Sequence, residues 1–171
     1  MPVEIERKFL VAKDSWRGHA RGQRYCQGYL SKGDVTVRVR RAGPRAFLTI
    51  KGSGQGIVRP EFEYEIPVEE AEEMFKLCRR PLIEKTRFEV VHDGLLWEID
   101  EFDGENAGLV LAEVELEHPG QPVALPDWIG DEVTADQRYR NSQLVDAPMG
   151  EEQAHSIEID RGSFHSNRAR G

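Results

Sequence analysis

Cysteine is scarce in this sequence, which contains only Cys26 and Cys78. Two cysteines are too few for a scaffold held by several disulfides or for a zinc site built from thiolates. Long apolar runs are also missing, so no segment is expected to span a bilayer as a helix. Charged residues begin at Glu4, too early for a secretory signal peptide. The sequence therefore predicts a cytoplasmic protein with reduced thiols and no membrane partner.

The sequence also lacks an excess of positive charge. Its 23 Lys and Arg residues are outnumbered by 31 Asp and Glu residues, which gives a formal net charge of −8. General nucleic-acid binders are usually basic, so this balance argues against a nucleic-acid partner. A small anionic ligand is not excluded, because binding depends on the local potential rather than on the total charge. The length of 171 residues is that of one ordinary domain.

Short segments that alternate between charged and apolar residues make up most of the chain. Successive side chains of an extended strand point to opposite faces. Residues 3–11 therefore place Glu4, Glu6 and Lys8 on one face, and residues 35–41 place Arg38 and Arg40 opposite valines. The expected strands are residues 3–11, 24–30, 35–41, 46–51, 57–66, 85–91, 95–102 and 109–118.

The rest of the chain shows one clear helical period. Ala71, Met74, Phe75 and Cys78 form an apolar stripe, which predicts a helix over residues 68–78. Residues 119–133 are expected to be an irregular connection, and residues 136–145 to end as a helix. Residues 149–171 lack any period and mix charge with Ser, Gly and His, which predicts a mostly disordered tail. The predicted folded domain therefore covers residues 1–148.

Eight short strands separated by turn signals predict a mainly β protein of the α+β class, with an antiparallel sheet or barrel. Two arrangements satisfy the alternation. In the first, the charged faces point to water and the apolar faces meet in a sandwich core. In the second, an eight-stranded antiparallel barrel has a charged interior and helices packed outside. Eight strands can enclose one small ligand.

The kinds of charge favour the second arrangement. Residues of one sign are paired two positions apart, where a solvated face would mix signs and neutral polar residues. The pairs are Glu4 with Glu6, Arg38 with Arg40, Glu61 with Glu63, Lys85 with Arg87, Glu98 with Asp100, and Glu113 with Glu115. Paired carboxylates offer oxygen ligands to Mg²⁺ or Mn²⁺, and paired Arg and Lys bind phosphate oxygens. A lined barrel of this kind suits a metal–polyphosphate complex.

The order of these motifs resembles the CYTH superfamily, also called the triphosphate tunnel metalloenzymes. Residues 4–8 have the family's E-x-E-x-K form, and the resemblance covers about residues 1–147. The other motifs that carry it are Gln27-Gly28-Tyr29-Leu30, Val37-Arg38-Val39-Arg40, Thr49-Ile50-Lys51-Gly52, residues 59–65, Glu84-Lys85-Thr86-Arg87, Trp97-Glu98-Ile99-Asp100, Ala112-Glu113-Val114-Glu115, residues 131–134 and Arg138-Tyr139-Arg140-Asn141.

The resemblance implies a tunnel that holds a linear triphosphate and needs a divalent metal, Mg²⁺ or Mn²⁺. The chain looks most like the short bacterial branch, where hydrolysis of inorganic triphosphate to pyrophosphate and phosphate is the usual activity. The alternatives are a nucleoside or thiamine triphosphatase, a class IV adenylate cyclase, whose typical His-Phe motif is not found here, and a polyphosphate- or nucleotide-binding module without turnover. Family members are often dimers, so a homodimer is implied by analogy alone.

Residue roles follow from this resemblance and from side-chain chemistry. The predicted metal ligands are Glu4, Glu6, Glu113 and Glu115, with Glu61, Glu63, Glu98 and Asp100 as second choices, some of which would hold basic residues in place. The predicted phosphate ligands are Lys8, Arg38, Arg40, Lys51, Arg59, Lys85, Arg87 and Arg138. The catalytic candidates are Lys8, Tyr29 and Lys85. Tyr29 is either a barrel residue or a contact to bound water or phosphate, and Arg7 is expected to face solvent.

Overall fold

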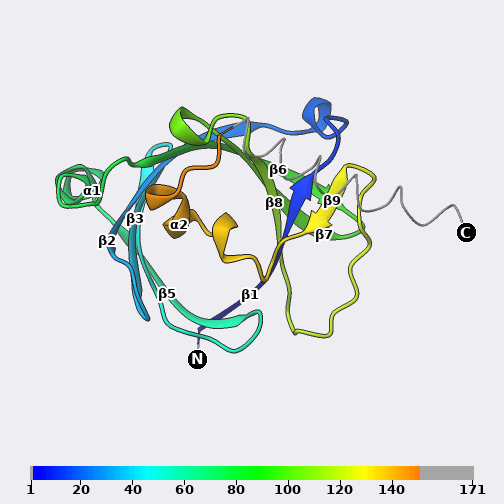
Figure 1. The fold of residues 1–171 in the computed structure, drawn as a ribbon, viewed down its shortest axis with the longest axis horizontal. Helices are drawn as coiled ribbons and strands as arrows, with labels where there is room; N and C mark the ends of the chain where they lie inside the picture. The colour runs from blue at the N-terminus through cyan, green and yellow to red at the C-terminus, as the bar shows by residue number, and fades with distance from the viewer. Residues whose placement is uncertain (1, 151–171) are drawn as a thin grey trace, which may run out of the picture.

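The structure, a computed structural model, describes residues 2–150. Eight antiparallel strands form a closed barrel, viewed from one end in Figure 1. Their order is β5-β4-β3-β2-β6-β7-β8-β1, and β1 pairs again with β5 to close the ring. The strands are β1 (Val3–Val11), β2 (Gly22–Ser31), β3 (Thr36–Ala42), β4 (Arg45–Lys51), β5 (Val58–Ile66), β6 (Ile83–His92), β7 (Leu95–Phe102) and β8 (Val110–Glu115), with a short β9 (Ile129–Glu132) beside β1.

The pairing registers turn the charged face of each strand toward the inside of the barrel. Lys8 of β1 lies opposite Glu113 of β8, and Glu113 lies opposite Glu98 of β7. On another part of the wall, Lys51 of β4 lies opposite Glu61 of β5. All five side chains line one internal cavity. The barrel with a charged interior is therefore confirmed, and the sandwich alternative is wrong.

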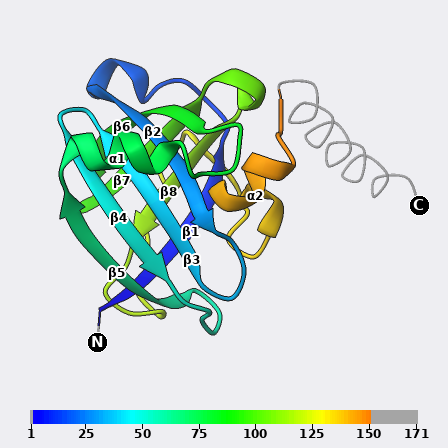
Figure 2. The same cartoon turned by 90° about the vertical axis from the view of Figure 1, so that its left-hand side faces the viewer.

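One helix packs on the outside of the barrel, as expected. Helix α1 (Val68–Phe75) buries Ala71 and Phe75 in a cluster with Val39 of β3 and Ala46 of β4. Figure 2 shows α1 lying across the strands on this side. The helix ends at Phe75, earlier than the predicted residue 78, but Cys78 is still buried in the same cluster. The apolar stripe thus identified the packed face correctly.

The connection after β8 contains a strand that the sequence did not reveal. Residues 129–132 form β9, which pairs with the carboxyl-terminal half of β1. The preceding Trp128 packs edge-on against Trp97, with ring centroids 5.6 Å apart. A strand of four residues with one distant partner is too short to show an alternation of apolar and polar residues in the sequence. Residues 119–133 are therefore less irregular than predicted.

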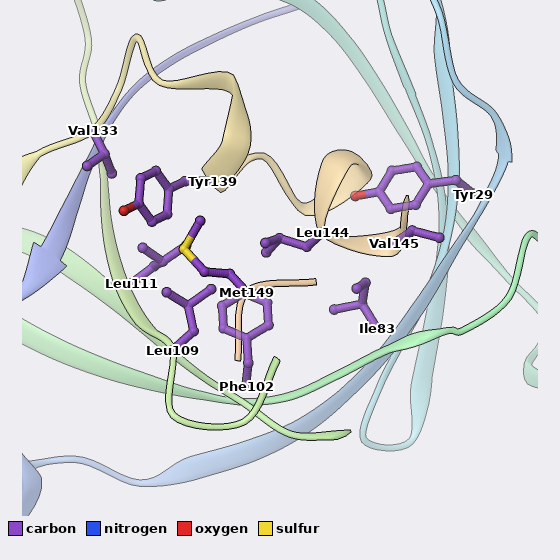
Figure 3. Packing of buried hydrophobic residues seen from close by; sticks show 10 residues of the cluster. All are labelled: Tyr29, Ile83, Phe102, Leu109, Leu111, Val133, Tyr139, Leu144, Val145 and Met149. Carbon is purple, nitrogen blue, oxygen red and sulfur yellow. The ribbon is translucent and has the colours of Figure 1, made fainter. Parts of the chain in front are cut away.

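The second helix lies at one end of the barrel instead of on its outside. Helix α2 (Asn141–Asp146) follows the short helical turn η3 (Gln137–Tyr139), and Figure 1 shows both within the ring of strands. Figure 3 shows the apolar cluster that holds them there. Its members are Tyr29, Ile83, Phe102, Leu109, Leu111, Val133, Tyr139, Leu144, Val145 and Met149. The expectation that helices pack outside holds for α1 alone.

Met149 lies near the end of the described part of the chain. Its side chain is buried in the cluster around α2, and its backbone N–H donates to Asn106 Oδ1 at 2.8 Å. The folded domain therefore includes this residue, which the sequence assigned to the tail. Residues 151–171 of the predicted tail lie outside the described residues. Within residues 2–150, none of the helices has the length and apolar character needed to cross a membrane.

Replacing Leu144 by Ala should strongly destabilise the protein, because its side chain is fully buried in the cluster at the end of the barrel. We expect the free energy of unfolding to fall by about 2–5 kcal/mol in urea denaturation. Leu77 is 76% exposed, so the matched change Leu77→Ala should stay within about 0.5 kcal/mol of the wild type. Equal losses in the two variants would mean that α2 does not pack as described.

Candidate active site

The barrel encloses a polar cavity of about 510 Å³. Its wall is built from alternate residues of the eight barrel strands, because every second side chain of a strand points inward. The segment that follows η3 closes part of it. The charged lining residues are Glu4, Glu6, Lys8, Arg38, Arg40, Lys51, Arg59, Glu61, Glu63, Lys85, Arg87, Glu98, Glu113, Glu115 and Arg140. Most of the charged residues predicted from the sequence are thus brought together in one space.

Asp100 is the anchor of the β6–β7 wall. Its carboxylate accepts from Lys85 Nζ at 2.6 Å and from Arg87 Nε and Nη2 at 2.7 and 2.8 Å. Arg87 also donates to Glu98 at 2.7 Å. Asp100 is 1% exposed and does not line the cavity. It lies beneath the two cations and fixes their position, so the structure favours this supporting role over direct metal binding.

The same contacts shift the pKa values of this pair of opposite charges. Burial alone would raise the pKa of Asp100, but Arg87 and Lys85 outweigh it and lower the pKa to about 2. Burial lowers the pKa of Lys85 to about 7, against the attraction of Asp100 and with the repulsion of Arg87 and Arg40. Lys85 Nζ also donates to Asn141 Oδ1 at 2.9 Å. Lys85 is therefore a cation whose charge an additional anion would stabilise.

The β1–β8 wall holds the densest group of carboxylates. Lys8 Nζ lies 3.4 Å from Glu113 and donates to the Tyr139 carbonyl at 3.1 Å. Burial opposes ionisation of Glu113, but Lys8 and Arg87 outweigh it, and its pKa falls well below the usual range. For Glu6 the balance is reversed: burial, Glu113 and Glu4 outweigh the attraction of Lys8 and Lys51 and raise its pKa well above the usual range. This corner of the cavity would bind a further cation.

The β3–β5 wall carries guanidinium groups that are only partly compensated. Arg38 Nη2 donates to Thr49 at 3.3 Å and lies 3.8 Å from Glu63, while its buried Nε has no hydrogen-bond partner among the described residues. Arg40 Nε donates to Gln27 Oε1 at 2.9 Å. Burial and the charges of Arg38 and Arg87 lower the pKa of Arg40 to about 10. A buried donor without a partner is costly, so this wall is suited to an anion.

Two further predicted cations, Lys51 and Arg59, share one carboxylate. Lys51 Nζ donates to both oxygens of Glu4 at 2.8 Å and lies 3.7 Å from Glu61. Arg59 Nη2 lies 3.5 Å from Glu4. Burial would raise the pKa of Glu4, but Lys51 outweighs it and the pKa is lowered. Glu4 is thus ionised and already engaged with cations from β4 and β5.

The carboxylates do not form a complete metal site by themselves. Within residues 2–150, no group of three or more His, Cys, Asp or Glu side chains is arranged to hold a metal ion. Mg²⁺ often uses only one or two protein carboxylates and takes its other ligands from substrate phosphates and water. Glu6 and Glu113 lie close enough to repel each other electrostatically, and their oxygen ligands suit Mg²⁺ or Mn²⁺. The donor set therefore fits a metal that arrives with its phosphate ligand.

Some predicted residues lie elsewhere, and some cavity residues were missed. Arg138 does not line the cavity; it is paired with Asp136 at 2.6 Å and 58% exposed at its side chain. Tyr29 lines the cavity, and its hydroxyl accepts from Gln27 Nε2 at 3.4 Å. The missed lining residues with polar or aromatic side chains are Tyr25, Thr36, Phe47, Arg140, Asn141 and Ser142.

A signal for two of the missed residues was present in the sequence. Tyr25 is two positions before Gln27 and four before Tyr29, on the same face of β2. Its ring lies 5.1 Å from the guanidinium carbons of both Arg40 and Arg87. Arg140 follows Arg138 by two positions in the Arg-Tyr-Arg-Asn motif, and only the structure tells which of the two arginines faces the cavity.

A closed barrel lined by alternating cations and carboxylates defines a class of protein built to hold a small polyanion. The chain belongs to the CYTH family, because residues 2–148 match the CYTH domain model. This match confirms the resemblance that the motifs indicated.

Relatives within this family are close. The chain is 50% identical to the inorganic triphosphatase of Acetivibrio thermocellus over 150 residues, which cover 86% of this chain and 96% of that protein. It is 39% identical to the inorganic triphosphatase of Nitrosomonas europaea over 148 residues, covering 84% and 97%. Among solved structures, the inorganic triphosphatase NE1496 superposes with a TM-score of 0.62 at 37% identity, covering 85% of this chain and 95% of that one.

Replacing Asp100 by Asn should destabilise the empty protein, because Lys85 and Arg87 lose their shared buried counter-ion. We expect a loss of about 3–5 kcal/mol in the free energy of unfolding at pH 7. The pKa of Asp100 falls from 3.8 to about 2 on folding. Its stabilisation is therefore complete above about pH 4 and disappears as the pH falls through about 2. The variant should lack this part of the acid dependence.

Glu132→Gln is the control for this prediction. Glu132 pairs with Arg7 at 2.8 Å on the outer surface, where both side chains are partly exposed. Such pairs contribute about 0–1 kcal/mol, so urea denaturation should barely distinguish Glu132→Gln from the wild type. If Asp100→Asn were equally mild, the two cations would have to be held by other groups.

Proposed function

We propose that this protein hydrolyses inorganic triphosphate to pyrophosphate and phosphate with the help of a divalent metal, Mg²⁺ or Mn²⁺. The observation that carries the proposal is the composition of the cavity wall. Among the described residues, eight Lys or Arg side chains and seven Glu side chains face one cavity. The wall is thus close to neutral, and cations and carboxylates both line it along β1 and β5. The named activity of two relatives at 50% and 39% identity supports the same substrate.

Charge balance explains why a metal is needed. Each terminal phosphate carries about 1.5–2 negative charges at neutral pH, and the middle phosphate adds another. A nearly neutral wall offsets the charge of such a ligand only in part, so divalent cations complete the charge balance that turnover needs. Glu6, Glu113 and Glu115 would hold the metal on the β1–β8 wall, next to the corner where carboxylates are crowded. The chemistry that a metal would supply there is compensation of the phosphate charge and activation of the attacking water.

The cations of the chain would position the substrate and offset its charge. Phosphoryl transfer depends mainly on positioning and on stabilising charge that moves to the leaving oxygen. Arg38, Arg40 and Arg87 present guanidinium groups that can bind phosphate oxygens in a fork. Lys8 and Lys85 lie at the β1 and β6 walls, where they would stabilise the leaving pyrophosphate. Tyr29 would contact a bound water or phosphate oxygen. The homodimer and the cytoplasmic location stay predictions.

The carboxylates of the cavity favour an enzyme over a module that only binds polyphosphate. A module that only held polyphosphate would be best served by cations on every wall. The cavity instead keeps seven Glu side chains, several with raised pKa values because burial and neighbouring carboxylates oppose their ionisation. Keeping these charges together destabilises the empty protein, so their presence favours a reaction that uses metal ions.

Glu6→Gln should remove a charge from the metal-binding corner while keeping the size of the side chain. We expect kcat for tripolyphosphate in Mg²⁺ to fall about 100-fold or more, equivalent to about 2.7 kcal/mol of barrier. Circular dichroism should show an intact fold. The control is Glu101→Gln, because Glu101 points outward from β7 and pairs with Arg17. Near wild-type turnover by Glu6→Gln would take this residue out of the site.

A phosphate-release screen over tripolyphosphate, ATP and thiamine triphosphate, each with Mg²⁺ or Mn²⁺, tests the proposed function directly. We expect kcat/KM for tripolyphosphate to exceed that for ATP by at least about tenfold, because only contacts strengthened in the transition state raise turnover. Among the described residues, charged side chains dominate the lining, and its rings Tyr25 and Phe47 already lie against guanidinium groups. ATP equal to tripolyphosphate would contradict the proposal, and formation of cyclic AMP would indicate a cyclase.

A further inference from the structure

A second cavity of about 470 Å³ adjoins the first. Thr36, Arg59, Arg140 and Ser142 line both cavities and therefore mark their junction. The rest of the second cavity is formed by the β2–β3 turn, the glycine-rich loop of residues 52–56 and one side of α2. The main cavity thus continues into a polar space, and two guanidinium groups stand where the two meet.

Arg140 is unusual among the cations of the main cavity. Lys8, Arg38, Lys51, Arg59, Lys85 and Arg87 each form an ion pair with a carboxylate. Within residues 2–150, the Arg140 side chain forms no ion pair and donates no hydrogen bond, and Arg40 has only Gln27 as a hydrogen-bond partner. Arg40, which is partly buried, and Arg140, which is exposed, are therefore the two described cations of the cavity without a carboxylate partner.

The backbone holds Arg140 firmly in this place. Its N–H donates to the Gln137 carbonyl at 3.1 Å, and its carbonyl accepts from the N–H groups of Gln143 and Leu144 at 2.9 and 3.1 Å. The next residue, Asn141, accepts from Lys85 and Gln27 at 2.9 and 3.0 Å. The guanidinium is thus mounted on a fixed backbone although its own tip is unpaired.

The surroundings of Arg140 are repulsive in the empty protein. Burial and the charge of Arg59 lower the pKa of Arg140. Arg59 forms its one ion pair with Glu4, and Glu4 also accepts two hydrogen bonds from Lys51. In the second cavity, Lys32 and Arg79 are both paired with Asp146. At the junction of the two cavities, Arg140 is therefore unpaired among the described residues, and Arg59 shares its one carboxylate with Lys51.

We propose that Arg140, together with Arg59, binds a terminal phosphate of inorganic triphosphate at the junction of the two cavities, and that this contact sets the preference for a chain with two free ends. Arg40, with Arg38 and Arg87 as neighbours, binds the opposite end. Inorganic triphosphate has two terminal phosphates, whereas a nucleoside triphosphate has one and presents an ester at its other end. An esterified phosphate has less charge and one fewer free oxygen, so a guanidinium fork gains less from it. This inference rests on the proposed function.

The test compares Arg140→Ala, Arg140→Lys and the control Arg7→Ala, whose native side chain points outward to Glu132. For Arg140→Ala we expect kcat/KM on tripolyphosphate to fall about tenfold or more, mainly through KM, as for one lost charge-assisted hydrogen bond. The effect on ATP should stay under about threefold, so that the preference shrinks. Arg140→Lys should restore part of the loss, since it keeps the charge but not the fork.

Binding without turnover separates this inference from the proposed function. Calorimetry with EDTA should show tripolyphosphate bound about tenfold more weakly by Arg140→Ala, and ATP bound nearly unchanged. The melting temperature of the empty variant should equal or exceed that of the wild type, because no contact is lost and repulsion from Arg59 is relieved. Wild-type affinity for tripolyphosphate in Arg140→Ala, or equal losses for both ligands, would overturn the inference. A wild-type protein that binds but does not hydrolyse tripolyphosphate would contradict only the proposed function.

Discussion

The buried ion triad of Asp100, Lys85 and Arg87 is the interaction on which the rest of the interior depends. A lysine and an arginine side by side in a protein interior would repel each other, so one would lose its proton or move out of the interior. One carboxylate beneath them, bonded to both within 2.8 Å, lets both remain in the wall. Lys85 then donates to Asn141 and ties the first residue of α2 to the barrel. The fold and the site are therefore stabilised by the same three side chains.

Pairing of opposite charges between strands extends this principle around the barrel. Lys8 with Glu113 and Lys51 with Glu4 give the empty cavity internal counter-ions. A bound triphosphate and its metal would compete for these partners, with phosphate drawing on the cations and metal on the carboxylates. Binding then exchanges one set of ion pairs for another, so the net gain is smaller than the count of contacts suggests. The unpaired groups contribute most to the free energy of binding, because they lose no ion pair when the ligand binds.

The sequence was sufficient for the strands and for the inward faces, since alternation fixes which side chains share a face. It did not tell which inward-facing side chains reach the cavity and which lie beneath its lining. Glu98 and Asp100 have the same parity, yet Glu98 lines the cavity and Asp100 lies beneath two cations. Nor could a helix predicted over residues 136–145 separate Arg138 from Arg140. Arg140 has an extended backbone, with φ −68° and ψ 133°, between η3 and α2, and this break decides which arginine faces the cavity.

The closure of the barrel by β1 also determines when the site is formed. β1 carries Glu4, Glu6 and Lys8, and its main partner is β8, about a hundred residues later in the chain. Pairing at such a separation costs loop-closure entropy before it returns any stability. During synthesis from the amino terminus, Glu6 and Lys8 lack their partners on β8, and the ring stays open, until residues 110–115 have emerged. A nascent or truncated chain without β8 therefore has no closed charged cavity. Ligand binding then indicates that the barrel is complete.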